Sequence, residues 1–339
     1  MGGTRTPVPP TVRRLAAVDD VVLGSVTCPS GHLVLVDGGY LGLWSGERSP
    51  DETGEPAAVD FEVVGPDADA AARSFDRQTG RRLYDIPERT AGGFAAKFDE
   101  HCRAHGLDAS SHRFPRRVPH RERVRHAVET GDTHFLISGV RVVPIGGVPT
   151  DRPLRVVATR GHWGWARIRI EVGDGTAVER RPLTRLGVDH ARFAFADADA
   201  LGSWVHEASL DGLADVMFWG RDEEEIAAEF GARRTGTPGD DVYAWLDIPI
   251  REAYRRAVAL QELRSAEPER GFAFDFRPHS HHWQVMAAVR AADHEAATIT
   301  IGGADIMMAM TSIGDGHFPV DLDLDATGAP VAVDITVDS

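Results

Sequence analysis

The last 29 residues of the chain decide its fold class, and they read Thr311-Ser-Ile-Gly-Asp-Gly-His-Phe-Pro-Val-Asp-Leu-Asp-Leu-Asp-Ala-Thr-Gly-Ala-Pro-Val-Ala-Val-Asp-Ile-Thr-Val-Asp-Ser339. Apolar side chains alternate with polar or small ones at residues 318–324 and again at 331–337. A period of two is typical of strands that bury one face. Asp325-Ala-Thr-Gly328 supplies a turn between the two runs. The stretch therefore predicts a closing β-hairpin.

The entrance to this hairpin carries a resemblance. Gly314-Asp-Gly-His-Phe-Pro-Val320, followed by a strand, an Asp/Gly turn and a last apolar strand, resembles the C-terminal signature of a bacterial domain-of-unknown-function family. Ser30-Gly-His-Leu-Val-Leu-Val-Asp37 looks like the Ser-Gly-strand-Asp segment of that family, which has Asp-Pro where this chain has Asp37-Gly38. The resemblance implies that the two segments lie together in the fold. It implies no activity.

Length and composition indicate a globular protein with a large core, because 42% of its 339 residues are hydrophobic. The net charge of −15 opposes non-specific attraction to nucleic acid, which is therefore an unexpected partner. No apolar run has the length of a membrane span, and the N-terminus lacks the apolar core of a signal peptide, so we expect no membrane partner and a cytoplasmic location. A single lysine, Lys97, against 36 arginines indicates a GC-rich bacterial genome.

Periodicity predicts more strands than helices. Helical spacing occurs at residues 67–78, 93–106, 223–230, 249–267 and 283–292, and strand-like runs occupy much of the remainder. We expect an α+β fold, mostly antiparallel sheet with a few covering helices. The composition changes at 173–189, which we interpret as a linker between an N-terminal β-rich lobe at 11–180 and a C-terminal α+β lobe at 190–338. No period of 20 to 50 residues repeats convincingly.

The densest group of titratable side chains is Asp275-Phe-Arg-Pro-His279-Ser-His281-His282-Trp283, between a predicted strand and a predicted helix. Imidazole nitrogens are ligands for zinc and similar metals. His279, His281 and His282 are therefore candidate ligands of a divalent metal, and no other cofactor is expected. The alternative is that Ser280 caps the helix while the histidines are surface or stacking residues.

Asp315 and His317 open the final hairpin. Because sequential elements are usually neighbours, we expect them to approach the same end of the sheet as the group that starts at Asp275. A pocket with carboxylates, an arginine and imidazoles is the setting in which ligands bind. The predicted ligand-binding residues are Asp275, Arg277, His279, His281, Asp315 and His317.

Residues 111–126 carry six arginines and three histidines against one glutamate. Guanidinium groups suit phosphate and carboxylate, so the stretch from Arg113 to Arg125 is a candidate docking site for an anionic partner. The alternative is a solvated surface segment that neutralises an acidic body.

No motif of the common enzyme classes occurs: the chain has no Gly-x-Ser-x-Gly, His-Glu-x-x-His, Walker, dinucleotide or Cys-x-x-Cys pattern. We therefore favour a non-catalytic module that binds a small molecule or a protein. The alternative hypothesis is a metal-dependent, hydrolase-like enzyme that uses the Asp/His cluster of residues 275–282 to acidify a bound water.

Overall fold

The computed structural model describes residues 20–53, 56–75, 80–132, 135–235 and 242–338. The strands are β1 (Asp20–Val26), β2 (His32–Asp37), β3 (Ala58–Val64), β4 (Arg82–Pro87), β5 (Ser110–Arg113), β6 (Phe135–Ile137), β7 (Val140–Gly146), β8 (Leu154–Arg160), β9 (Trp165–Glu171), β10 (Glu179–Val188), β11 (Arg192–Asp197), β12 (Leu213–Gly220), β13 (Arg233–Thr235), β14 (Val242–Pro249), β15 (Phe272–Pro278), β16 (Ala296–Ile301), β17 (Ala304–Met310), β18 (Gly316–Leu324) and β19 (Pro330–Thr336). The helices are α1 (Ala68–Phe75), α2 (Glu88–His105), α3 (His120–Thr130), α4 (Glu223–Phe230), α5 (Ile250–Ala266) and α6 (His281–Ala291), with short 3-10 turns η1 (Leu41–Leu43), η2 (Pro50–Glu52) and η3 (Ala200–Ser203).

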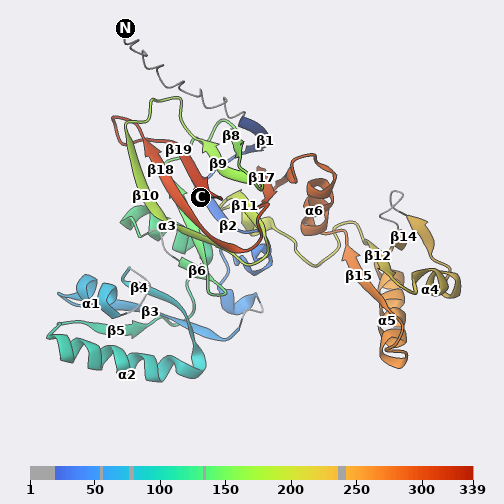
Figure 1. Cartoon of the computed structure of the whole chain (residues 1–339). Helices are drawn as coiled ribbons and strands as arrows, with labels where there is room; N and C mark the ends of the chain where they lie inside the picture. The colour runs from blue at the N-terminus through green and yellow to red at the C-terminus, as the bar shows by residue number, and fades with distance from the viewer. Residues whose placement is uncertain (1–19, 54–55, 76–79, 133–134, 236–241, 339) are drawn as a thin grey trace, which may run out of the picture.

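A β-sandwich forms the centre of the molecule (Figure 1). One six-stranded sheet has the order β1-β8-β9-β19-β18-β10, and the other has the order β16-β17-β11-β2-β7-β6. The largest core cluster lies between them and takes apolar residues from both sheets, such as Leu35, Ile168, Phe195 and Ile335. Helices α3 and α6 cover the outer face of the second sheet, where Val124 and Val285 are buried against it. The sandwich thus has one internal core and one helix-covered face.

Two smaller sheets project from the sandwich (Figure 1). The first has the order β4-β3-β5, and α1 and α2 pack on it around a core that contains Phe98. The second has the order β13-β14-β12-β15, and α4 and α5 pack on it around a core that contains Phe218. In both, a central strand (β3 or β12) is followed by a helix, a strand that pairs with it (β4 or β14), a longer helix and the strand on its other side (β5 or β15). Apart from β13, an added edge strand beside β14, the two small sheets therefore share one topology.

This likeness extends to the whole chain, which is an internal duplication. We call residues 20–172 the N-terminal half and 179–337 the C-terminal half. Each half runs through two strands, a 3-10 turn, a small α/β sheet, a helix and four strands in the same order. Each large sheet consequently contains three strands from each half, and equivalent strands lie at equal distances from its two edges. The two halves meet where β2 pairs with β11 and where β9 pairs with β19.

A pseudo-twofold axis passes through these two pairings. In the β2·β11 ladder Leu35 lies opposite Phe195, and Asp37 and Asp197 occupy equivalent ends. The two aspartates also make equivalent bonds across the axis: Asp37 Oδ2 accepts the His190 N–H at 3.1 Å, and Asp197 Oδ2 accepts the Ser30 N–H at 2.7 Å. The halves are therefore held together as two subunits of a symmetric dimer would be.

The hairpins predicted from alternation are confirmed. The closing hairpin consists of β18 and β19, which pair antiparallel around the turn after Leu324. Another consists of β16 and β17, joined by Gly302 and Gly303 at φ values of 58° and 82°. Two consecutive positive φ values are the geometry of the tight turn that matches the twist of a hairpin. Every pairing among the described strands is antiparallel, which confirms the expected mostly antiparallel α+β class.

The expected linker at 173–189 is wrong, because residues 179–188 form β10. Its polar start, Glu179-Arg-Arg-Pro, resembles a linker in composition. The strand lies at the edge of its sheet, however, where charged side chains and a proline are tolerated. The lobes at 11–180 and 190–338 stay a prediction, although both large sheets take strands from each of these ranges.

Among the described residues, no helix combines the length and the apolar character that crossing a membrane requires.

Candidate functional site

The candidate site lies on the small sheet of the C-terminal half, around His279. This residue follows β15, and its backbone N–H donates to the Leu213 carbonyl at 3.2 Å. The ring is therefore held between the ends of β12 and β15. Its Nδ1 lies 2.9 Å from Asp211 Oδ2, and its Nε2 lies 3.3 Å from Asp215 Oδ1. Asp247 Oδ1 is 3.8 Å from the same Nε2.

Local backbone distortions orient the carboxylates of Asp215 and Asp247 toward the His279 ring. The β12·β14 register shifts between Ala214 and Val216, so Asp215 sits at a bulge. Asp247 has a φ of 51°, a left-handed conformation that aspartate tolerates better than most residues. The Asp247 N–H donates to Asp215 Oδ1 at 2.8 Å. The side chains of Asp215, Asp247 and His279 each offer one ligand atom, and these atoms all lie within 4.8 Å of one another.

Charge around His279 favours its protonated form. Partial burial disfavours the imidazolium, but hydrogen bonds and the charges of Asp211 and Asp215 outweigh it, so the pKa of His279 is raised. The same hydrogen bond, together with the Leu213 N–H, lowers the pKa of the Asp211 carboxyl to about 2. In the structure, the imidazolium of His279 therefore supplies positive charge to the carboxylates of Asp211 and Asp215.

A cavity of about 230 Å³ adjoins the ring and is lined by Asp215, Arg277, His279, Trp283 and Gln284, among others. Asp275 and Arg277 form an ion pair at 2.7 Å. Arg277 and Arg290 lie over the Trp283 ring, at 5.0 and 5.8 Å from its centroid. The cavity thus has an acidic side at Asp215 and a cationic, aromatic side at Trp283.

The N-terminal half carries the equivalent carboxylates, Asp60 in β3 and Asp85 in β4. The bulge recurs between Val59 and Phe61, the φ of Asp85 is 57°, and the Asp85 N–H donates to Asp60 Oδ1 at 2.8 Å. Here a buried guanidinium fills the space. Arg123 Nη1 lies 2.6 Å from Asp85 Oδ2, and Nη2 lies 3.2 Å from Asp60 Oδ2.

Gln284 stands in α6 at the position that Arg123 has in α3. The first residues of the two helices fix this alignment, since His120 Nδ1 accepts the Ser45 N–H and His281 Nδ1 accepts the Val205 N–H, each at 3.0 Å. Both helices have 11 residues. The C-terminal half therefore keeps the two carboxylates but lacks the arginine that neutralises them in the N-terminal half.

The structure brings only part of the predicted site together. Asp275, Arg277 and His279 lie in or next to β15, beside the cavity. Asp315 Oδ1 instead accepts the Ala191 N–H at 2.8 Å, and His317 is an exposed residue of β18 opposite Gly187. The interactions of the described residues do not join these two groups.

The three candidate metal ligands also have different neighbours. His281 uses its Nδ1 to accept the Val205 N–H. The ring of His282 packs against that of His206, with centroids 4.3 Å apart, and burial lowers its pKa to about 3. Ser280 Oγ accepts the Trp283 N–H at 3.3 Å, as the capping alternative predicts. Of the three histidines, His279 is the one that faces the carboxylates.

The arginine stretch from Arg113 to Arg125 is largely paired with the chain itself. Arg117 and Arg123 have side chains that are 2% and 0% exposed. Four of the six arginines form ion pairs with carboxylates, and these are Arg113, Arg117, Arg121 and Arg123. The acidic residues that neutralise them come from distant parts of the chain, which local charge counting does not reveal. Arg113, Arg116 and Arg125 are nevertheless exposed, so a docking site for an anionic partner stays a prediction.

Comparisons of this protein with family models, with curated proteins and with solved structures find no match. The resemblance of its ends to a bacterial domain-of-unknown-function family stays a prediction.

Proposed function

We propose that the chain is a non-catalytic binding module and that its C-terminal half holds a divalent metal ion between Asp215, Asp247 and His279. One observation carries this proposal. The equivalent carboxylates of the N-terminal half are neutralised by Arg123, whereas the C-terminal half has Gln284 at that position. Carboxylates placed together in a fold are stable when a cation sits between them. A bound ion would supply that charge in place of the proton on His279, whose pKa the same carboxylates raise.

The donor set suits such an ion. Imidazole nitrogen and carboxylate oxygen bind zinc at about 2.0–2.2 Å, so two ligands of one ion are about 3.0–3.5 Å apart. The Nε2 of His279 lies 3.3 Å from Asp215 Oδ1 and 3.8 Å from Asp247 Oδ1. Asp211 accepts a hydrogen bond from the other ring nitrogen, which is the orienting contact that metal-bound histidines usually have.

Metal binding by chelator-treated protein tests the proposal. Calorimetric titration with zinc or manganese should give one site for each chain, and His279→Gln should abolish it. His317→Gln is the matched control, because His317 is an exposed histidine of the sandwich and should leave the titration unchanged. Absence of a stoichiometric site, or equal binding by the His279 variant, would contradict the proposal. Circular dichroism of each variant verifies that it is folded.

A hydrolase-like activity is the second candidate, and the adjoining cavity favours it. Three protein ligands leave a coordination position open, and a metal there lowers the pKa of a bound water. Arg290 and Arg277 could receive an anionic substrate across the cavity of about 230 Å³. Zinc-loaded protein would then hydrolyse p-nitrophenyl phosphate or acetate, and Asp215→Asn would remove this turnover. If turnover is no greater than that of the His279→Gln variant, the hydrolase candidate is refuted and only the binding function remains.

A further inference from the structure

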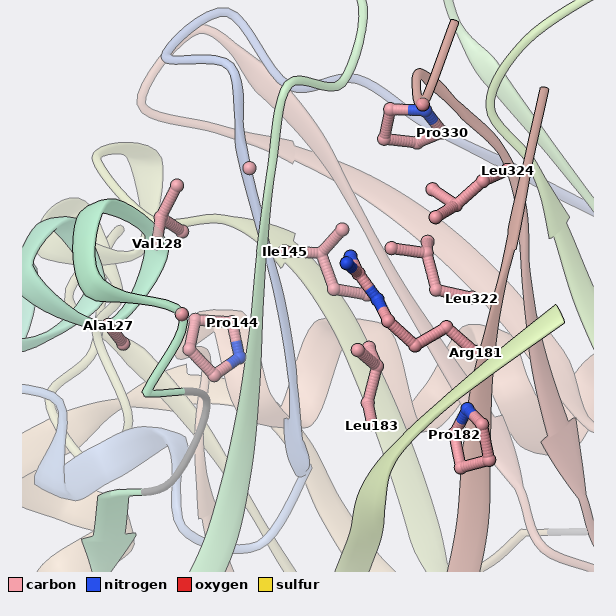
Figure 2. Close-up of a pocket in the computed structure, with 13 residues that line it drawn as sticks. Ala127, Val128, Pro144, Ile145, Arg181, Pro182, Leu183, Leu322, Leu324 and Pro330 are labelled. Carbon is pink, nitrogen blue, oxygen red and sulfur yellow. The ribbon is translucent and has the colours of Figure 1, made fainter. Parts of the chain in front are cut away.

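A second cavity lies at the edge of the sandwich. None of its lining residues lines the cavity beside His279. It has a volume of about 430 Å³ and lies among the end of α3, β7, β10 and the β18–β19 hairpin. Figure 2 shows its apolar lining, which includes Ile145, Leu183, Leu322, Leu324 and Pro330. Ile145, Leu322 and Leu324 belong to the core between the two sheets. The cavity is thus an opening into the apolar interior of the sandwich.

One charged side chain, that of the exposed Arg181, lies among these apolar side chains. Arg181 of β10 extends across the cavity toward Ile145 (Figure 2). Its neighbour Arg180 is paired with Asp323 and Asp334 on the other face of the sheet. Among the described residues, no carboxylate and no hydrogen-bond acceptor pairs with Arg181, and the side chains around it are apolar. An unpaired guanidinium above an apolar cavity is complementary to a ligand with an anionic end and an apolar body.

The duplicated half shows that the fold does not require this opening. The ladder β1·β8 places Val21 opposite Ala158, and the ladder β10·β18 places Arg181 opposite Leu322 at the equivalent position. Val21 packs against the core. Trp165 closes the β8–β9 hairpin where Pro330 closes β18–β19, and it is 5% exposed. In the N-terminal half, Val21 and Trp165 fill the region that is open in the C-terminal half.

We propose that this cavity binds the carboxylate of an apolar molecule, such as a medium-chain alkyl carboxylate. The carboxylate pairs with Arg181, and the alkyl chain lies along Leu183, Leu322 and Ile145. The volume falls within the range of small-molecule sites. Most lining side chains are apolar, although polar atoms contribute slightly more of the exposed lining than apolar atoms do. The inference is independent of the metal site.

A series of straight-chain carboxylates from butanoate to decanoate, titrated by calorimetry, tests this proposal. Each buried methylene is expected to strengthen binding about fourfold until the cavity is full. Alcohols of the same length should bind at least tenfold more weakly than the carboxylates, because they cannot pair with the guanidinium. Carboxylates that bind no better than alcohols would overturn the proposal, and so would the absence of millimolar binding across the series.

Variants locate the site. Arg181→Met should weaken carboxylate binding about tenfold and leave alcohol binding unchanged, since the apolar walls remain. Arg185→Met is the matched control, because Arg185 is an exposed arginine of the same strand that does not line the cavity, and it should change neither. Pro330→Trp places in this half the residue found in the other, and it should abolish binding of both ligand classes. Full binding by either Arg181→Met or Pro330→Trp protein would place the ligand elsewhere and refute the proposal.

Discussion

Gln284 and Arg123 occupy the same position in the two halves of this chain. Arg123 is positively charged and contacts two carboxylates, whereas Gln284 carries no charge. Arg123 is fully buried and contacts Asp60 and Asp85, whereas Gln284 is exposed and lines a cavity beside Asp215. A duplicated fold thus offers an internal comparison, because the same backbone distortions serve a closed site in one half and an open site in the other.

The first prediction exchanges this residue. Gln284→Arg should place a guanidinium between Asp215 and Asp247 and lower the affinity for zinc at least tenfold, because the two cations would compete for the same oxygens. The measurement is calorimetric titration of the chelator-treated variant. Gln284→Met has a side chain of similar size without charge and should keep the affinity within about twofold. Equal loss in both variants would show that shape, rather than charge, matters there.

The second prediction concerns the closed site. Arg123→Gln should destabilise the protein by about 3–5 kcal/mol, because it leaves the buried Asp60 without its charged partner. Burial raises the pKa of Asp60, opposed by the charge of Arg123, and loss of that charge should raise it further. Urea unfolding at pH 7 measures the change. Arg116→Gln, an exposed neighbour, should stay within about 0.5 kcal/mol.

The third prediction is a pH dependence from His282. Burial and the nearby charges of His206 and Arg192 hold its pKa at about 3, below the usual 6.5. The unfolded chain therefore binds more protons between these values, and the stability present above pH 6.5 is lost as pH falls toward 3. His282→Gln should reduce the loss between pH 6.5 and 4.5 by about 1–2 kcal/mol, after allowance for solvent screening. An identical pH profile of unfolding in both proteins would refute this.

Local patterns predicted the hairpins but not their partners. The Gly302-Gly303 turn and the alternating runs at 318–324 and 331–337 specify β16 to β19 within a short stretch of chain. The ladders β2·β11 and β9·β19 join segments about 160 residues apart, which no local period encodes. Two short repeats could have revealed the duplication. Leu41-Gly-Leu-Trp44 recurs as Leu201-Gly-Ser-Trp204, and Asp85-Ile-Pro87 recurs as Asp247-Ile-Pro249.

Of the three proposed metal ligands, only His279 was predicted from the sequence, although the predicted Arg277 also lines the adjoining cavity. His279 stands in a dense group and draws attention, whereas Asp211, Asp215 and Asp247 are single acidic residues 32 to 68 positions away. The β12·β14 and β12·β15 pairings bring them together, and the bulge at Asp215 and the left-handed Asp247 aim them. Such distortions follow from tertiary pairing, so sequence spacing alone could not place these carboxylates.

The last prediction tests whether the halves depend on each other. The chain can be cut after Gly175, in an exposed loop between β9 and β10. Each half alone would expose two unpaired strand edges, at β2 and β9 or at β11 and β19, and would lose half of the core between the sheets. We therefore expect neither piece to unfold cooperatively by itself, because open edges and a divided core favour aggregation over folding.

Mixed pieces should assemble one to one and regain the near-ultraviolet circular dichroism of the intact chain. Phe195→Ala, at the centre of the β2·β11 pairing, should weaken this assembly by about 3–5 kcal/mol. Two pieces that each fold stably as monomers would show instead that the expected lobes are independent.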